Sequence, residues 1–217
     1  MFIGHFATGL AARPLAPRAP LPVLLAATQV LDIAWPVFIA TGVERARIER
    51  GHLPASPLVL EHMPYSHSLL FALGWAVVFA LGYLALTRDG RGALVAAVLV
   101  VAHWPLDWIA HDHDVPLLPG GARYGLGLWR SVPGTLAIEL AMFAIGAALY
   151  TRATRATGPI GRRGWPALAL FLAGAFVVAT VAPPPPSIGG VVVGLVATLV
   201  IAIGAAVPID RQRPART

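Results

Sequence analysis

The chain has 217 residues, of which 57% are hydrophobic and 12% are charged, and its mean hydropathy is +0.73. This composition excludes a soluble globular domain and predicts a membrane protein. There is no cysteine, which excludes disulfides, thiolate metal sites and cysteine nucleophiles, so any bound metal must have nitrogen and oxygen ligands. All 16 basic residues are arginines and lie mostly between apolar segments, so the net charge of +6 indicates membrane topology rather than a nucleic-acid partner.

The apolar segments predict an all-α polytopic bundle that crosses the membrane about six times. A short apolar piece, residues 1–12, comes first. It is too short to cross about 30 Å of hydrocarbon and lacks the basic flank and cleavage site of a signal peptide, so we expect a half-inserted or interfacial helix. The six spans are expected at residues 21–43, 66–87, 92–111, 131–151, 166–182 and 189–207.

The positions of ionisable residues divide the chain into two membrane domains. Residues 1–151 contain histidines and carboxylates within the spans and are predicted to form a membrane-embedded metal-site domain. An Arg- and Gly-rich linker, residues 152–165, leads to a C-terminal two-helix hairpin with a basic tail, residues 166–217. The spans 166–182 and 189–207 contain no ionisable residue, so we assign them a packing or assembly role.

The arginines predict how the bundle is oriented. With six spans, the terminal segments and the loops 88–91 and 152–165 share one side and carry eleven of the 16 arginines. Cytoplasmic segments collect arginine, so both termini are expected in the cytoplasm. The loops 44–65 and 112–130 then lie on the outer side.

The end of the third span carries the strongest functional signal. It places His103, Asp107 and His111 at four-residue steps, which return to nearly the same helical face and together rise by roughly 12 Å. Ionisable residues are costly inside a membrane, so they usually face a bundle interior and serve a metal, a proton path or a substrate. The segment therefore predicts a functional site.

Other spans bring further polar side chains to the outer half of the bundle. Asp32 lies near mid-depth of the first span, His67 opens the second, and Glu139 lies about two turns into the fourth. Histidine and carboxylate ligands from separate helices suit zinc, manganese or iron, with zinc as the first choice. His5 lies on the N-terminal piece, which the arginine count places on the cytoplasmic side, so it joins the cluster only if that piece dips inward or if the number of spans differs by one from six.

These residues also have structural interpretations. A single buried histidine such as His5 is more often a hydrogen-bonded packing residue than a ligand. Asp32 comes shortly before Trp35 and Pro36 and could cap carbonyl groups at a helix kink. Five further residues lie in polar loops, where solvated surface is the default expectation. They are His52, His62, His113, Asp112 and Asp114.

The motifs around these positions resemble a known family. They are Phe2-Ile3-Gly4-His5-Phe6, the segment from Leu25 to Asp32, Tyr65-Ser66-His67-Ser68, and His103-x-x-x-Asp107. Together, over roughly residues 1–150, they are similar to the YdjM-like membrane-bound metal-dependent hydrolase family of bacterial inner-membrane proteins. The ligand pattern of that family is similar to that of zinc-dependent phospholipases C. The resemblance implies a multi-pass inner-membrane protein with metal ligands at His5, Asp32, His67, His103 and Asp107, and also at His111 and Glu139.

The expected activity is metal-assisted hydrolysis of a lipid-like phosphoester or ester. A divalent ion would activate water, Asp107 could bridge two ions, and Glu139 or Asp32 could serve as general base. A site recessed in the bilayer makes membrane lipid a candidate substrate as well as the environment. Outer arginines could attract an anionic head group or simply anchor the interface. They are Arg45, Arg47, Arg123 and Arg130, of which the last two are the substrate-binding candidates.

Two other classes of protein fit the same residues. A metal-ion or proton-coupled transporter would use the same cluster, but its path should continue into the cytoplasmic half, where no comparable ladder exists beyond His5. A structural protein with an inert metal would show closed coordination without a water position. A homo-oligomer is compatible with each of these functions.

Overall fold

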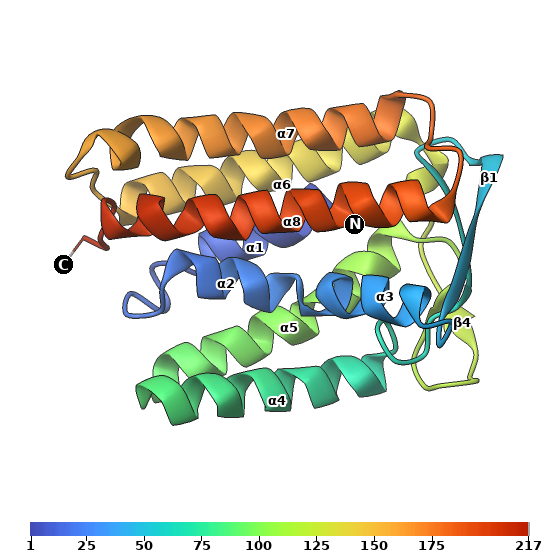
Figure 1. The fold of residues 1–217 in the computed structure, drawn as a ribbon, viewed down its shortest axis with the longest axis horizontal. Helices are drawn as coiled ribbons and strands as arrows, with labels where there is room; N and C mark the ends of the chain where they lie inside the picture. The colour runs from blue at the N-terminus through green and yellow to red at the C-terminus, as the bar shows by residue number, and fades with distance from the viewer. Residues whose placement is uncertain (217) are drawn as a thin grey trace.

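The computed structural model describes residues 1–216 and is a bundle of α-helices that run roughly along one long axis (Figure 1). Five helical segments are long and apolar enough to cross a membrane, and a bent pair of shorter helices provides a sixth. The predicted all-α polytopic architecture is therefore confirmed. The five segments are α4 (Leu69–Thr87), α5 (Gly90–Ala110), α6 (Val132–Ala153), α8 (Ile188–Arg211), and the run Ile160–Val181, in which a π-helical turn (Ile160–Gly164) precedes α7 (Trp165–Val181).

The first expected span, residues 21–43, is broken into two helices. α2 (Leu21–Thr28) and α3 (Val30–Ala40) meet at Gln29 and are bent by 55°. Gln29 has φ −113° and ψ 8°, outside the helical region. Hydropathy predicts one continuous span because both halves are apolar. The break places Asp32 in the first turn of α3.

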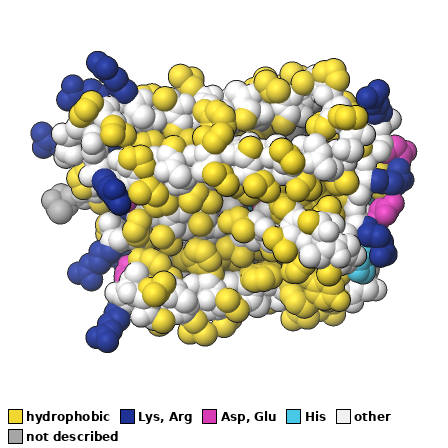
Figure 2. Space-filling model, in the orientation of Figure 1, with side chains coloured by type: hydrophobic (Ala, Val, Ile, Leu, Met, Phe, Trp, Pro, Cys, Tyr) yellow, Lys and Arg dark blue, Asp and Glu magenta, His cyan; other side chains and the backbone are white. Residues whose placement is uncertain are grey.

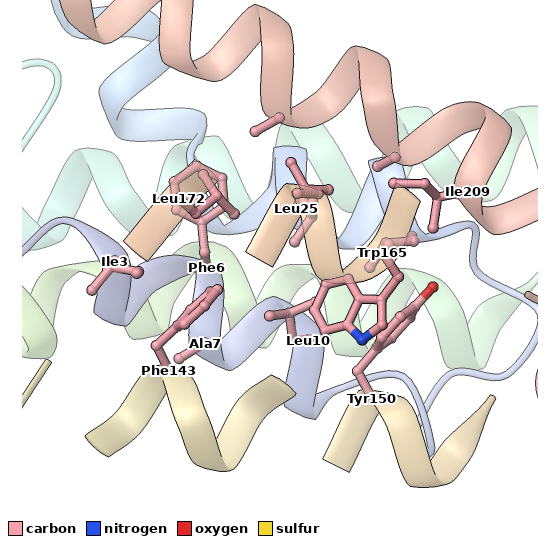
Figure 3. Close-up of a cluster of buried hydrophobic side chains, with 14 of the residues drawn as sticks. Ile3, Phe6, Ala7, Leu10, Leu25, Phe143, Tyr150, Trp165, Leu172 and Ile209 are labelled. Atoms are coloured by element: carbon pink, nitrogen blue, oxygen red, sulfur yellow. The ribbon is translucent and has the colours of Figure 1, made fainter. Parts of the chain in front are cut away.

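The N-terminal helix α1 (Ile3–Ala11) is enclosed in the middle of the bundle. Phe6 and Leu10 are buried in a core that also contains side chains of α2, α6, α7 and α8 (Figure 3). Helix α6 approaches so closely that a Cβ atom on Gly146 would lie 2.4 Å from the carbonyl oxygen of Ala7. The expected short N-terminal helix is present, and it is enclosed by the other helices of the bundle.

The C-terminal helices share this core with the N-terminal half of the chain. Leu172 and Phe176 of α7 and Ala202 and Ala206 of α8 are buried together with α1. A second core cluster joins α2 to α4 and α5. Helices α1 and α2 therefore lie between the α4–α5 pair and the α6–α8 group, which Figure 1 shows on opposite sides of the bundle.

An antiparallel hairpin covers the end of the bundle at which α5 terminates (Figure 1). It consists of β1 (Arg45–Leu53) and β2 (Ser56–His62), with Arg47 opposite Val59. A second small pairing joins β3 (Val115–Pro116) to β4 (Arg123–Tyr124). Both lie in the segments expected to form outer loops. Arg47, a residue expected to attract a head group, instead donates hydrogen bonds to Glu49 and Glu61.

Charged side chains gather at the two ends of the bundle, and an uncharged belt lies between them (Figure 2). The end that holds the C-terminal tail is rich in arginine, and there Arg13 forms an ion pair with Asp210 at 3.1 Å. The hairpin end carries charges of both signs. Met1 is buried inside the bundle, and the N-terminus lies at neither end. Which end faces the cytoplasm stays a prediction.

Candidate metal centre

Asp107 lies at the centre of a buried cluster of imidazole rings. His103, one turn earlier on α5, places Nε2 3.0 Å from Asp107 Oδ2, and His111, which caps α5, places Nε2 3.5 Å from Oδ1. From α1, His5 Nε2 lies 3.0 Å from Oδ1, and the amino group of Met1 contacts the same oxygen. The four-residue spacing brings the three side chains of this segment together, as helical periodicity predicts.

Asp32 on α3 and His67 before α4 extend the cluster. His67 Nε2 lies 3.5 Å from Asp32 Oδ1 and 3.6 Å from Asp107 Oδ2. Two trios of potential ligands result, and within each the ligand atoms lie within 4.8 Å of one another. One trio is His5, His103 and Asp107, and the other is Asp32, His67 and His103. Five of the expected ligands therefore form two adjacent groups that share His103.

The distances in the cluster suit side chains that share a cation. Ligand atoms on a tetrahedral zinc ion lie about 3.3 Å apart, given bond lengths of about 2.0–2.1 Å. The contacts between imidazole nitrogens and the two central carboxylates range from 3.0 to 4.0 Å. His103 Nε2 lies 3.0 Å from Asp107 but has hydrogen-bond geometry to no partner among residues 1–216. A metal ion would satisfy this buried nitrogen, which is otherwise costly.

The backbone of α2 fixes the tautomer of His103. Its Nδ1 lies 2.7 Å from the carbonyl oxygen of Thr28, beside the break between α2 and α3. A carbonyl oxygen can only accept, so Nδ1 must carry the hydrogen and the neutral ring must have its lone pair on Nε2. That lone pair faces Asp107, which is the orientation required of a metal ligand.

A buried carboxylate orients His67 through a serine. The hydroxyl of Ser66 donates to Glu44 Oε2 at 2.5 Å, and the backbone N–H groups of Tyr65 and Ser66 donate to Oε1 at 2.8 Å each. Because the Ser66 proton is committed to Glu44, its oxygen accepts from His67 Nδ1 at 2.7 Å. His67 Nε2 therefore also presents a lone pair to the cluster. We call Glu44 and Ser66 the outer relay.

His111 has the same arrangement, with a different partner. Its Nδ1 donates to Asp114 Oδ1 at 2.9 Å, and its ring lies 4.1 Å from that of Trp129, centroid to centroid. The expectation that Asp114 is merely solvated is therefore wrong, because this carboxylate is half-buried and holds a histidine of the cluster. His113 matches the expectation, since its side chain is 71% exposed.

Glu139 on α6 uses only one of its two carboxylate oxygens. Oε2 accepts hydrogen bonds from the backbone N–H groups of Phe2 at 2.8 Å and Gly4 at 3.1 Å. These groups belong to the start of α1, where N–H groups have no partner within the helix. Oε1 is buried and has no partner among the described residues. Glu139 thus caps α1 with Oε2, while Oε1 makes no hydrogen bond within residues 1–216.

A cavity of about 640 Å³ opens beside the cluster. Asp32, His67, Asp107, His111 and Glu139 line its polar end, and much of the remaining wall comes from α3, the hairpin and the ends of α7 and α8 that lie next to the hairpin. This volume lies within the range of small-molecule sites, about 300–1,000 Å³. The C-terminal helices therefore line the cavity in addition to packing in the core.

The arginines expected to bind substrate lie outside the cavity lining. Arg123 donates to two carbonyl oxygens of β2, and Arg130 donates to Asp112 at 2.6 Å. The hydrogen bond that Asp112 accepts from His113, and to a smaller extent the one from Arg130, lowers the pKa of Asp112 below its ordinary value. The cavity is instead lined by Arg50 near the hairpin tip. Within residues 1–216 the Arg50 guanidinium forms no ion pair and no hydrogen bond.

Comparisons of the chain with protein-family models, with curated proteins and with solved structures gave no match. The resemblance to the YdjM-like family therefore stays an expectation based on motif positions. The function has to be inferred from the side-chain geometry of the cluster and its cavity.

Proposed function

We propose that the protein is a membrane-embedded, metal-dependent hydrolase that cleaves an ester or phosphoester bond of a lipid-like substrate. The observation that carries this proposal is the common orientation of three histidine rings, those of His67, His103 and His111. Each ring donates Nδ1–H away from the cluster and turns Nε2 toward a central carboxylate. When the rings are neutral, their Nε2 lone pairs point at carboxylate oxygens, and a metal ion bound between them would remove the repulsion.

The donor set favours zinc, with manganese or iron as alternatives. Neutral imidazoles and carboxylates without thiolate suit these ions. Asp107 could hold one ion or bridge two, since Oδ1 lies near His5 and Oδ2 lies near His67 and His103. His111 and Asp32 complete the set of ligands at the border of the cavity.

Glu139 is the proposed general base. A bound divalent ion would supply Lewis acidity and activation of water at neutral pH. Glu139 lines the cavity and its Oε1 has no hydrogen-bond partner within residues 1–216, so this carboxylate could accept the proton that the attacking water loses. The hydrogen bonds from Phe2 and Gly4 hold Oε2 and so fix the direction of the carboxylate. Asp32, which also lines the cavity, is the second candidate for this role.

A lipid-like substrate fits the place of the site in the bundle. The cavity joins the ligand cluster to apolar walls formed by membrane-spanning helices. Arg50 lines the same cavity and could bind an anionic head group. As part of this proposal we include membership of the YdjM-like family, location in a bacterial inner membrane, and a cytoplasmic position for the arginine-rich end.

A transporter is the weaker alternative because the cavity that contains the cluster is lined from the hairpin end of the bundle. Toward the arginine-rich end, Phe6, Leu10 and Leu25 fill the bundle with apolar side chains that are at most 1% exposed. None of these three side chains lines the cavity. A conducted ion or proton would need polar groups at that level.

The proposal is tested by hydrolysis in detergent. Purified protein is incubated with zinc or manganese and a panel of phospholipids, lipid phosphates and fatty-acyl esters, and product release is measured. Asp107→Asn should lose activity by roughly 100-fold or more, because an amide cannot supply the charge that holds the ion. The matched control is Asp112→Asn, which changes an aspartate of the same outer end that lies outside the cluster.

Two results would contradict the enzyme. One is equal activity in Asp107→Asn and in the unchanged protein. The other is metal uptake into sealed proteoliposomes without hydrolysis of any compound in the panel, which would establish the transporter instead.

A further inference from the structure

The outer ends of α7 and α8 form one wall of the cavity that contains the ligand cluster. Ala175, Phe176 and Ala179 line it from α7, and Gly194 and Leu195 line it from α8. We call this part of the cavity the α7–α8 groove. Figure 1 shows these helix ends on the same side of the bundle as the hairpin.

The lining residues fall on a single stripe of each helix. On α8 the cavity is lined at positions 190, 191, 194, 195 and 198, which follow the spacing of one helical face. Eight residues of helix correspond to about 12 Å along the axis. The groove therefore runs inward along the bundle instead of ending at its outer surface.

Small side chains keep the groove open. A Cβ atom on Gly194 would have no neighbour within 4 Å, so open space lies directly beside this position of α8. Gly194 and Ala179 are exposed. Because these two exposed residues lie on helices long and apolar enough to span a membrane, the groove is accessible from the side of the bundle.

The opposite end of the same cavity is polar. Glu139, which is 0% exposed, lines it there together with Asp107 and His111. Arg50 of the hairpin lines the same cavity with a guanidinium that no other side chain engages within residues 1–216. A single molecule that fills the cavity must therefore present a polar, preferably anionic group to the cluster and an apolar chain to α7 and α8.

We propose that the α7–α8 groove binds an acyl chain of the lipid substrate and that its depth determines which chain lengths are hydrolysed efficiently. This inference rests on the proposed hydrolase function and adds the part of the chain that selects the substrate. A chain that enters sideways stays in an apolar environment throughout, while the bond to be cleaved reaches the ligand cluster. Each methylene that the groove buries strengthens binding by about fourfold.

The test compares two glycine substitutions on the same helix. Gly194→Phe places a large side chain in the groove, whereas Gly204→Phe places it on a part of α8 that lies outside the cavity. A Cβ atom meets nothing within 4 Å at either position, so both variants are compatible with the fold. Turnover is measured for a series with the same head group and butanoyl, octanoyl or hexadecanoyl chains.

We expect Gly194→Phe to lower kcat/KM for the hexadecanoyl substrate by about tenfold or more while the butanoyl substrate changes by less than about twofold. Gly204→Phe should retain the profile of the unchanged protein. An equal loss on all chain lengths would overturn the groove as the selecting element, and so would an unchanged profile in Gly194→Phe.

A binding measurement separates the groove from the reaction. Protein in vesicles of phosphatidylglycerol is labelled with a phospholipid that carries a photoreactive diazirine near the end of one acyl chain, and the labelled residues are mapped by mass spectrometry. Labelling at Ala175 and Ala179 should be strong and should fall in Gly194→Phe but not in Gly204→Phe.

Persistent labelling without hydrolysis of any substrate would support the groove and contradict the hydrolase. Labelling that Gly194→Phe does not change would overturn the groove. If Gly194→Phe instead dissociates an oligomer and leaves the labelling unchanged, the face is a contact between two copies of the chain and the proposal is wrong.

Discussion

The carbonyl oxygen of Thr28 accepts a hydrogen bond from Nδ1 of His103 across 75 residues of sequence, at a distance of 2.7 Å. The acceptor lies at the break between α2 and α3, and the donor lies one turn before Asp107 on α5. Because the carbonyl cannot donate, this contact turns the lone pair of His103 Nε2 toward the carboxylates. The broken helix therefore contributes directly to the candidate metal centre.

The first prediction concerns His103. His103→Ala should reduce the bound metal to less than about a tenth of that in the unchanged protein, because this nitrogen belongs to both trios of ligands. Metal content is measured by elemental mass spectrometry after purification. The control is His113→Ala, which removes an exposed imidazole from the nearby loop and should leave the metal content unchanged. Equal metal content in the two variants would contradict the assignment.

The second prediction concerns the outer relay. Ser66→Ala should weaken metal affinity by about 10- to 100-fold, because His67 loses the group that fixes its tautomer and ring orientation. Glu44→Gln should also weaken metal affinity. In the double variant the loss of affinity should be smaller than the sum of the two single losses, because Glu44 and Ser66 act through one chain of hydrogen bonds. Affinity is measured by competition with a chelator.

Ser68 provides a matched control for the relay. Its hydroxyl donates to the carbonyl of Pro64 and accepts from the backbone N–H of Phe71, which caps α4. Ser68→Ala should lower stability by about 1 kcal/mol through loss of the cap while metal affinity remains. If Ser66→Ala and Ser68→Ala had the same effect on affinity, the relay would have no specific role.

The third prediction separates the two roles of Glu139. Glu139→Gln keeps an oxygen that can accept from Phe2 and Gly4, so α1 should stay capped and metal should stay bound, while the rate falls by roughly 100-fold. Glu139→Ala should lose the cap as well, which should appear as a lower thermal midpoint. A rate in Glu139→Gln close to that of the unchanged protein would exclude Glu139 as the general base and leave Asp32 as the candidate.

The fourth prediction concerns sidedness. A cysteine at Ala122, in the exposed loop of the hairpin end, should react with a membrane-impermeant thiol reagent in intact cells, whereas a cysteine at Arg163 should not. Arg163 is exposed and lies in the segment that joins α6 to α7. Reversed labelling would place the site at the cytoplasmic face.

The sequence is sufficient to predict those parts of the site that depend on local periodicity. The steps between His103, Asp107 and His111 follow from the helical repeat, and hydropathy identifies the spans that surround them. Polar residues in apolar segments identify Asp32 and His67 because burial of an unpaired charge is costly.

The remaining parts depend on packing between distant segments. His5 joins the cluster because α1 is enclosed by the bundle, which hydropathy cannot distinguish from an interfacial helix. Glu44 and Asp114 lie in polar loops whose composition is that of solvated surface, and only the folded chain brings them to Ser66 and His111. The groove in α7 and α8 consists of small apolar residues, which in sequence look the same as helix packing positions.

The most direct test of the metal centre is X-ray absorption spectroscopy at the metal edge of the purified protein. We predict nitrogen and oxygen neighbours at about 2.0–2.1 Å and the outer-shell scattering of at least two imidazole rings, with a coordination position that added inhibitor or substrate analogue changes. Protein that contains no metal after purification without chelator, or a spectrum without imidazole scattering, would contradict the assignment of His103 and Asp107 as the core of a metal-dependent active site.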